Sequence, residues 1–146
     1  MTVSIKLIKL LMYFEAFRGK AYLPTKDDVW TIGYGETKGV KEGDTMSEPY
    51  ARQLLTKRLE EFQNELKPLI KVPLTENQLS AVTSLVYNIG ITAFKKSQAL
   101  KSLNAGDFKS FKRQAFSPEI GFVKQKGKIL KGLVNRRQME KELFES

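Results

Sequence analysis

One carboxylic acid near the start of the chain is placed to act as a general acid. Glu15 falls one helical turn after Leu11, so it lies at the edge of an apolar helix face. Partial burial at such an edge disfavours the charged form, and a general acid must hold its proton near neutral pH. The alternative is a salt bridge with Arg18, Arg136 or Arg137.

The segment Thr31-Ile32-Gly33-Tyr34-Gly35 is a second candidate feature. In an extended strand, Thr31 shares one face with Gly33 and Gly35, and the bulky residues lie on the other face. Two glycines on one face let a ligand approach the backbone closely, which favours a binding groove. The alternative is a tight turn that needs glycine for its backbone dihedrals.

The missing residue types exclude several kinds of active site. The chain of 146 residues has no Cys and no His. It therefore has no thiol nucleophile, no Ser-His-Asp triad and no zinc site of the usual kind. Catalysis must rest on carboxylates, hydroxyls, lysines or backbone groups, and we expect neither a metal nor another cofactor.

The chain is strongly basic, with 25 Lys and Arg against 16 Asp and Glu, a formal net charge of +9. Between Lys95 and Arg137 there are twelve basic residues against only Asp107 and Glu119, so this stretch holds +10. Such an excess favours a polyanionic partner, such as nucleic acid, an anionic membrane or a cell wall. The alternative is a solubilising surface without a specific partner.

Capping residues and apolar spacing predict the elements that position these residues. Ser4 caps a first helix that we expect to end at Gly19, and residues 20–43 predict a small hairpin sheet. Ser47 begins a long helix to about Leu66. The elements expected after it are a buried helix opened by the capping box of Thr75 and Gln78, helices at about 95–104, 107–115 and 130–144, and a loop over 117–128.

Six motifs in order resemble the phage lysozymes of glycoside hydrolase family 24, and together they cover nearly the whole chain. They are residues 14–22 (FEAFRGKAY), 30–35 (WTIGYG), 74–79 (LTENQL), 87–90 (YNIG), 103–107 (LNAGD) and 132–137 (GLVNRR). Six motifs in sequence form a far more specific signal than any one of them.

The resemblance implies an α+β, lysozyme-like fold that is mainly α, with a small antiparallel hairpin sheet near the N-terminus and a long inter-lobe helix. We expect residues 1–146 to form a single lysozyme-like domain. Its β-containing lobe would span about 15–60, and its helical lobe would span about 67–146 and include the N-terminal helix. The implied function is that of a phage endolysin, a muramidase that hydrolyses the β-1,4 bond between N-acetylmuramic acid and N-acetylglucosamine and lyses the host cell.

The family's catalytic pattern is a Glu, an Asp nine residues later and a Thr six beyond that. Glu15 and Thr31 match this pattern by their surroundings, although they are sixteen residues apart here. Pro24 stands at the Asp position and has no acid-base capacity. We hypothesise that Asp28 or Asp27 replaces the family Asp from the other arm of the hairpin. The alternative is that both acids only form a turn.

Where the second strand begins decides between the two acids. Asp28 is favoured because it lies next to the strand start expected at Val29. If the strand begins earlier, Asp27 shares the face of Thr31 instead. Thr25 is a weaker candidate for holding the water.

Four further residues match family positions that line the cleft or brace it. They are Asn88, Ser97, Arg136 and Arg137. For Asn88 and Ser97, hydrogen bonds between helices are the alternative to sugar contact. We expect one of the two arginines to pair with Glu15 and the other to be exposed. Glu36 stands where the family commonly has His, which implies the loss of an ion pair that anchors the lobe.

The partners implied are bacterial peptidoglycan and an anionic outer-membrane lipid, the latter through the basic region from Lys124 to Lys141. We do not expect nucleic-acid binding, because the aromatic residues do not alternate with the basic ones as a stacking platform requires. We expect a monomer without a secretory signal, which waits in the host cytoplasm until a holin-type pore gives it access to the wall. Lytic transglycosylation, for which a single Glu suffices, is the alternative reaction on the same substrate.

Overall fold

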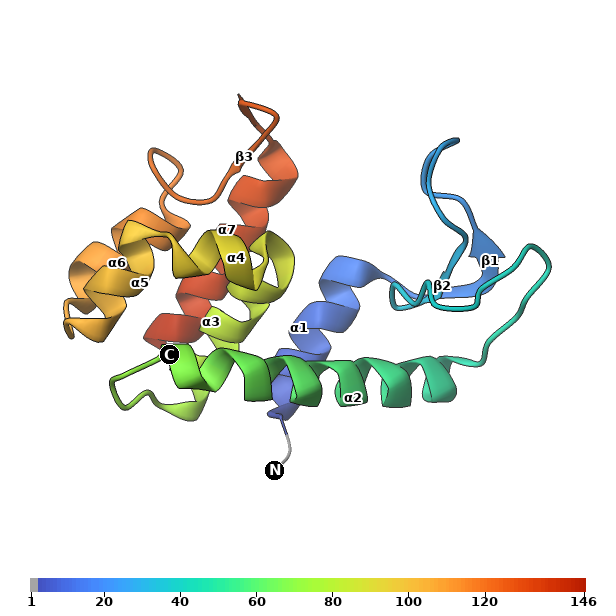
Figure 1. Ribbon diagram of the computed structural model, residues 1–146, viewed down its shortest axis with the longest axis horizontal. Coiled ribbons are helices and arrows are strands. Elements are labelled where there is room, and N and C mark those ends of the chain that lie inside the picture. Colours follow the sequence, from blue (N-terminus) through green and yellow to red (C-terminus); the bar gives the residue numbers. More distant parts are fainter. Residues whose placement is uncertain (1–2) are drawn as a thin grey trace. The chain divides into compact units, whose positions relative to one another are not determined.

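The computed structural model describes residues 3–146, which form mainly helices and two small sheets (Figure 1). Contacts within the chain divide it into two compact units, one ending at Glu61 and the other spanning Phe62–Ser146. The first unit holds α1 (Ile5–Glu15), β1 (Arg18–Tyr22), β2 (Thr31–Gly33) and most of α2 (Glu48–Leu66). The expected combination of helices and a small antiparallel sheet is confirmed.

Helix α1 begins as the sequence predicts but ends earlier. Oγ of Ser4 accepts a hydrogen bond from the backbone N–H of Leu7 at 3.1 Å and so caps the helix. The helix ends at Glu15, because Ala16 adopts a φ of 55° and a ψ of 141°. Gly19, the expected end, lies inside β1 instead.

Strands β1 and β2 form an antiparallel pair with an irregular register. Arg18 pairs with Gly33 and Tyr22 pairs with Thr31, so β1 carries two more residues than β2 between the same partners. Such a bulge bends the strand and increases its twist. Strand β2 begins at Thr31, not at Val29, so the hairpin acids lie outside it.

Helix α2 buries one stripe of small and branched residues. Ala51, Leu55 and Leu59 recur every fourth residue and are fully buried. Its first residue, Glu48, accepts a hydrogen bond from the hydroxyl of Tyr34 at 2.7 Å and forms an ion pair with Arg52. These contacts fix the start of α2 to the segment that follows β2.

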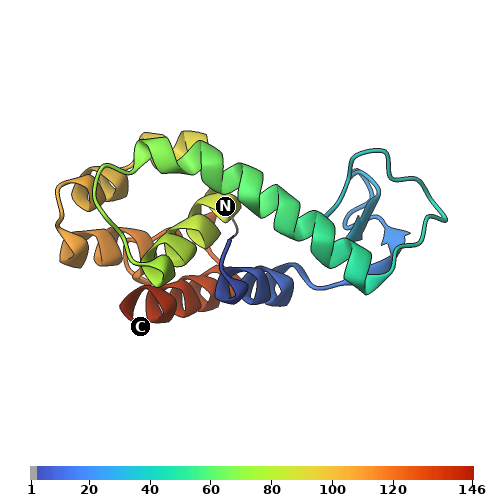
Figure 2. The same cartoon turned by 90° about the horizontal axis from the view of Figure 1, so that it is seen from below.

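The second unit is a group of helices around one aromatic-rich core. After a short 3-10 turn, η1 (Lys67–Leu69), it contains α3 (Glu76–Ile89), α4 (Ile91–Lys95), α5 (Gln98–Asn104), α6 (Phe108–Phe116) and α7 (Lys131–Glu145). Helix α7 packs along α3 and α6 (Figures 1 and 2). The rings of Phe111, Phe116 and Phe144 contact one another in the core.

Helix α3 confirms two expectations. The side chains of Thr75 and Gln78 form a reciprocal capping box at its start. Every residue from Ser80 to Val86 is buried, as the low charge of this helix predicts.

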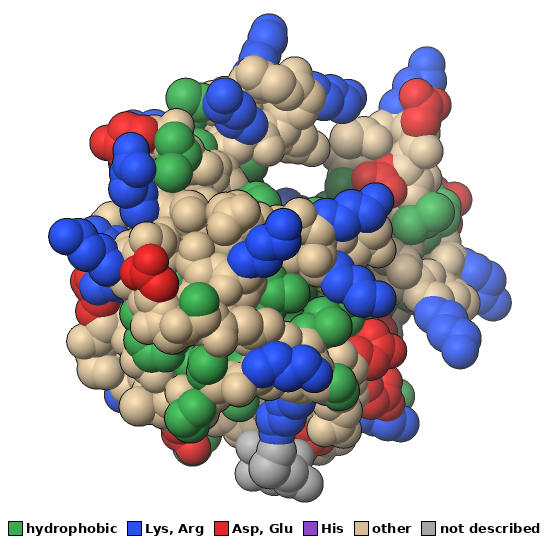
Figure 3. Space-filling view, turned by 60° about the vertical axis from the view of Figure 1, so that its left-hand side comes forward, with side chains coloured by type: hydrophobic (Ala, Val, Ile, Leu, Met, Phe, Trp, Pro, Cys, Tyr) green, Lys and Arg blue, Asp and Glu red, His purple; other side chains and the backbone are tan. Residues whose placement is uncertain are grey.

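The expected loop over residues 117–128 contains a hairpin at its end. Strands β3 (Lys124–Gln125) and β4 (Lys128–Ile129) pair across Lys126 and Gly127, whose φ angles are 51° and 78°. Two positive φ angles in a two-residue loop are typical of a type I′ turn, which matches the twist of the strands. The hairpin is exposed and presents lysines (Figure 3). No helix in the described part of the chain is long and apolar enough to cross a membrane.

Candidate active site

Glu15 is the last residue of α1, and its carboxylate lies beside the turn that follows β2. The side chain is half-buried. A Cβ built at Gly35 would lie 3.4 Å from Oε1 of Glu15, so this oxygen borders the space that the glycine leaves free. Gly35 has a φ of +91°, a conformation that favours glycine. The fold therefore sets a carboxylic acid next to backbone that carries no side chain.

A strained residue holds Glu15 at this position. Ala16 has a positive φ, a conformation that costs a residue with a side chain about 1–3 kcal/mol. Its backbone N–H still donates to the carbonyl of Met12 at 3.1 Å, which completes the last turn of α1. The chain then turns into β1, so α1 ends abruptly with Glu15 as its final residue.

Thr31 opens β2 and is only 7% exposed. Its hydroxyl donates to the carbonyl of Val29 at 3.0 Å. Since the single hydroxyl proton is used in this bond, the oxygen is left to act as an acceptor. A water held by Thr31 would therefore donate a proton to it and keep its own lone pairs free.

The two glycines that follow Thr31 have different surroundings. A Cβ at Gly33 would lie 2.8 Å from Sδ of Met46 and 3.1 Å from Cβ of Ala51, and its φ is +64°. The tight-turn interpretation therefore accounts for Gly33, because packed side chains fill the side where a ligand would approach. Gly35 instead borders Glu15. It also lines a pocket of about 370 Å³ with Glu36, Thr37, Lys38, Leu54, Lys57, Arg58 and Glu61.

The two acids of the hairpin are exposed and lie in a turn. The backbone N–H of Asp28 donates to the carbonyl of Thr25 at 3.1 Å, and Oδ1 of Asp28 accepts from the N–H of Val29 at 2.9 Å. Asp28 thus has the turn-forming contact that its residue type predicts. Asp27 is equally exposed. Neither acid lies on β2, so strand register does not decide between them.

Glu36, which stands where the family commonly has His, forms an ion pair of its own. Its carboxylate pairs with Nε of Arg58 on α2. Nη2 of the same guanidinium donates to the backbone carbonyl of Tyr34 at 2.7 Å. Arg58 therefore fixes the turn that contains Gly35 from both sides.

In the second unit, the predicted residues Asn88, Arg136 and Arg137 come together around Glu140. Both arginines are buried, with exposed fractions of 7% and 0%, so the expectation that one of them is exposed is wrong. They are buried because Glu140, one turn later on α7 and also 0% exposed, accepts from both. Whether an arginine pairs with Glu15 stays a prediction.

The distances describe a dense network. Oε2 of Glu140 accepts from the hydroxyl of Ser84 at 2.5 Å and from Nε of Arg136 at 3.2 Å, and Oε1 lies 2.7 Å from Nε of Arg137. Burial raises the pKa of Glu140, and the two guanidinium groups oppose this rise. Burial likewise lowers the pKa of Arg137, against the attraction of Glu140.

Arg137 also joins α3 to the segment before β3. Its Nη2 donates to Oδ1 of Asn88 at 2.8 Å, and its Nη1 donates to the carbonyl of Phe122 at 3.1 Å. With its oxygen used in this way, the amide of Asn88 is left with its N–H donors. Asn88 is exposed and lines a pocket of about 340 Å³ with Ile89, Phe122, Lys124, Gln125 and Leu133.

Ser97 has a local role. Its hydroxyl donates to the carbonyl of Phe94 at 2.7 Å, and its oxygen accepts from the N–H of Leu100 at 3.2 Å. It therefore caps α5 next to the end of α4, and contact of Ser97 with a sugar stays a prediction.

Sequence reasoning missed several residues of these networks. Glu140 was within reach of prediction, because a carboxylate three and four residues after two arginines faces them on a helix. Lys124 and Gln125 reach the Asn88 pocket only through the β3–β4 hairpin, which carries no signal beyond its Lys-Gly turn. Arg58 gives no sequence signal at all, since its partners lie more than twenty residues away.

Comparisons with known proteins identify the family and the fold of this chain. The family described as phage lysozyme matches residues 12–140. An endolysin of Acyrthosiphon pisum secondary endosymbiont phage 1 is 40% identical over 146 residues, which is 100% of this chain and 99% of the relative. The muramidase domain of SpmX from Asticaccaulis excentricus has a TM-score of 0.83 at 32% identity and covers 99% of this chain and 97% of its own.

A mutant of P22 lysozyme has the same TM-score of 0.83 at 33% identity, over 100% of this chain and 99% of its own. Its fold confirms the lysozyme-like architecture expected from the motifs. The match to the family extends from α1, which carries Glu15, to the end of the Arg137–Glu140 network. The chain therefore belongs to the phage lysozyme family.

Proposed function

We propose that this chain hydrolyses the β-1,4 bond between N-acetylmuramic acid and N-acetylglucosamine, with Glu15 as the general acid. As a phage lysozyme it is a glycoside hydrolase that degrades peptidoglycan. The observation that carries the assignment of Glu15 is its half-buried carboxylate beside the bare backbone of Gly35. The absence of a side chain at Gly35 leaves room for a sugar oxygen to reach the acid from that side.

The other steps use the hairpin and the start of β2. Glu15 donates its proton to the glycosidic oxygen as that bond breaks. A second carboxylate, Asp28 or Asp27, takes a proton from the attacking water. Thr31 accepts a hydrogen bond from this water, because its own proton is held by the carbonyl of Val29. Thr25, whose carbonyl holds the hairpin turn, keeps the acids in place.

Asn88 supplies a contact that suits the N-acetyl groups of this substrate. The amide oxygen of Asn88 already accepts a hydrogen bond from Arg137, so the N–H groups of Asn88 are left to donate to a ligand in the adjacent pocket. Gln125 and Lys124 add further donors from the hairpin. A donor-rich pocket selects a ligand that accepts hydrogen bonds, and the carbonyl of an acetamido group is a neutral acceptor of that kind.

The basic surface fits an enzyme whose substrate is anionic. The +10 stretch from Lys95 to Arg137 raises the rate of encounter with a negatively charged wall, an effect that fades with salt. As a monomer released through a holin-type pore, the protein would meet the wall from the cytoplasmic side. The basic region Lys124–Lys141 is the part proposed to contact an anionic lipid.

The test is loss of turbidity of permeabilised Gram-negative cells with the wild type and with Glu15→Gln, Asp27→Asn and Asp28→Asn. Glu42→Gln is the matched control, since it removes an exposed carboxylate from the same unit. We expect Glu15→Gln and one Asp variant to lose at least about a hundredfold in rate. A fully active Glu15→Gln would overturn the assignment of the general acid.

Product analysis separates hydrolysis from the alternative reaction. Hydrolysis leaves a reducing end on each new chain, whereas transglycosylation leaves an anhydro sugar because the substrate's own hydroxyl attacks. If both Asp variants keep wild-type activity and anhydro sugar accumulates, the chain is a lytic transglycosylase with Glu15 as its single carboxylate. We expect reducing ends.

A further inference from the structure

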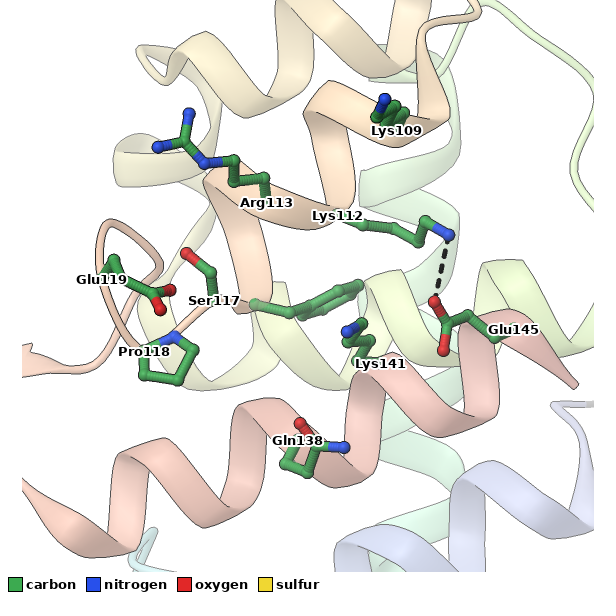
Figure 4. Close-up of a pocket in the computed structure, with 10 residues that line it drawn as sticks. Lys109, Lys112, Arg113, Ser117, Pro118, Glu119, Gln138, Lys141 and Glu145 are labelled. Carbon is green, nitrogen blue, oxygen red and sulfur yellow. Dashed lines mark hydrogen bonds and ion pairs between the residues drawn. The ribbon is translucent and has the colours of Figure 1, made fainter.

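The second unit carries a pocket that shares no residue with the sites described above. It lies between α6 and α7 and has a volume of about 590 Å³ (Figure 4). The turn that follows α6 closes one end of it. The residues that line this α6–α7 pocket are Lys109, Lys112, Arg113, Phe116, Ser117, Pro118, Glu119, Gln138, Lys141 and Glu145.

The charges of the α6–α7 pocket do not cancel. Lys112 reaches across to Glu145 and forms an ion pair at 3.0 Å, so these two neutralise each other (Figure 4). Lys109, Arg113 and Lys141 form no ion pair within residues 3–146. The only other charge in the lining is the negative charge of Glu119, so the pocket has a net charge of +2.

This arrangement does not serve the stability of α6. Lys109 precedes Arg113 by four residues and Lys112 by three, so like charges lie on one face of the helix. Such like-charge pairs slightly destabilise a helix. An anion bound beside them would offset this repulsion.

The pocket also has an apolar wall. The ring of Phe116 lines it while packing against Phe111 and Phe144, which fixes its position. Pro118 and the aliphatic stems of the lysines add further apolar surface. Arg113 lies with Ser117 at the end opposite to the Lys112–Glu145 pair, and Lys141 rises from α7 between the two ends (Figure 4).

We propose that the α6–α7 pocket binds a phosphomonoester carried on a sugar or a lipid headgroup. A phosphomonoester carries about −1.5 to −2 charge near pH 7, which matches the net charge of the pocket. Its terminal oxygens accept from the planar fork of Arg113 and from the ammonium group of Lys141, and Lys109 adds a further positive charge to the pocket. A carboxylate brings only one charge and two oxygens. The body of the ligand lies against Pro118 and the aliphatic stems of the lysines.

The first experiment titrates the ¹⁵N-labelled protein with glucose 6-phosphate and follows backbone amide shifts. We expect saturable shifts confined to α6, the 117–119 turn and α7. Unphosphorylated glucose and glucuronate, which carries a carboxylate, should produce at least about tenfold weaker binding. Equal binding of glucuronate, or shifts spread over the whole surface, would overturn the proposal.

Variants separate a specific site from general attraction to a basic protein. The double variant Arg113→Gln, Lys141→Gln should weaken binding at least about tenfold, and Glu119→Gln should tighten it a few-fold. The matched control is Lys95→Gln, Lys96→Gln, which removes the same charge from exposed positions outside the pocket. Equal loss in the control pair would show attraction to net charge alone and reject the pocket.

Vesicles identify the source of the phosphate. Vesicles of phosphatidic acid carry a phosphomonoester, whereas phosphatidylglycerol vesicles of equal charge density carry a phosphodiester. Tighter binding to phosphatidic acid that depends on Arg113 and Lys141 supports the proposal and assigns a lipid source. Saturable binding of glucose 6-phosphate alone supports it with a soluble source. If neither probe binds in a manner that depends on these residues, the proposal fails. None of these measurements requires turnover, so they do not depend on the proposed reaction.

Discussion

Replacing Glu140 by glutamine tests how the buried arginine network is stabilised. The substitution keeps the shape of the side chain and removes its charge. In the wild type this carboxylate lies 2.7 Å from Nε of Arg137 and 3.2 Å from Nε of Arg136. Within residues 3–146 it is the only carboxylate that forms an ion pair with Arg137. The variant therefore leaves a fully buried guanidinium facing a neutral amide.

The structure sets the size of the effect. Breaking a buried ion pair by removing one partner destabilises a protein by about 3–5 kcal/mol, because the other charge stays buried. Unfolding of a chain of this length has an entropy of about 0.3 kcal/mol/K. We therefore expect the melting temperature of Glu140→Gln to fall by about 10–16 °C.

The assay is thermal unfolding followed by circular dichroism at pH 7, with chemical denaturation as a second measure. Arg137→Met and the double variant Arg137→Met, Glu140→Gln complete the cycle. Because the double variant leaves no unpaired charge at position 137, it should regain at least half of the stability that Glu140→Gln loses. The two single effects are therefore expected not to add.

Two results would refute this reasoning. A loss below about 1 kcal/mol in Glu140→Gln would mean that burial keeps Glu140 protonated, so that neutral hydrogen bonds hold the network. Additive single effects would mean that Arg137 and Glu140 act independently of each other. The Asn88 contact gives an internal check, since its side-chain amide resonances should shift when Arg137 is replaced.

Three further predictions concern other parts of the chain. Burial and the hydrogen bond to Glu48 raise the pKa of Tyr34 from 10.0 to about 12. Its contribution to stability should therefore be lost as pH rises through 12, and Glu48→Gln should lower this pKa in an absorbance titration. Hydrogen bonds from Ser110 in the first turn of α6 lower the pKa of Asp107 below 3.8. Its contribution to stability should therefore be present above pH 3.8 and be lost as pH falls below that value. In thermal unfolding, Asp107→Asn should not show this loss of stability at acid pH. Gly33→Ala should destabilise the fold by about 2–4 kcal/mol in chemical denaturation, because the added Cβ is crowded and the φ is positive. Gly39→Ala, where φ is +73° but the space is open, should destabilise it by only about 1 kcal/mol. Equal losses in the two variants would contradict the crowding at Gly33.

Local signals in the sequence determined the starts of several elements. Ser4 and the pair Thr75 and Gln78 cap helices through hydrogen bonds that span only three residues, so the residue types suffice to predict them. The absence of His and Cys narrowed the chemistry in the same direct way. The six motifs then identified the family, because six motifs in the same order are far more specific to one fold than any single residue.

Tertiary structure decided where elements end and which charges are buried. Helix α1 ends at Glu15 and not at Gly19, because pairing of β1 with β2 draws the chain away through the strained Ala16. Gly33 is required by the packing of Met46 and Ala51, which no pattern near Gly33 indicates.

The two arginines show the physical reason most clearly. The sequence predicts that one of Arg136 and Arg137 is exposed, but both are buried, and an arginine is buried only when partners compensate its desolvation. Glu140 lies close in sequence, but Ser84, Asn88 and Phe122 come from segments that only the fold brings to α7. The local sequence determines hydrogen bonds between residues three or four positions apart. The tertiary fold determines the contacts between residues that lie tens of positions apart in the sequence.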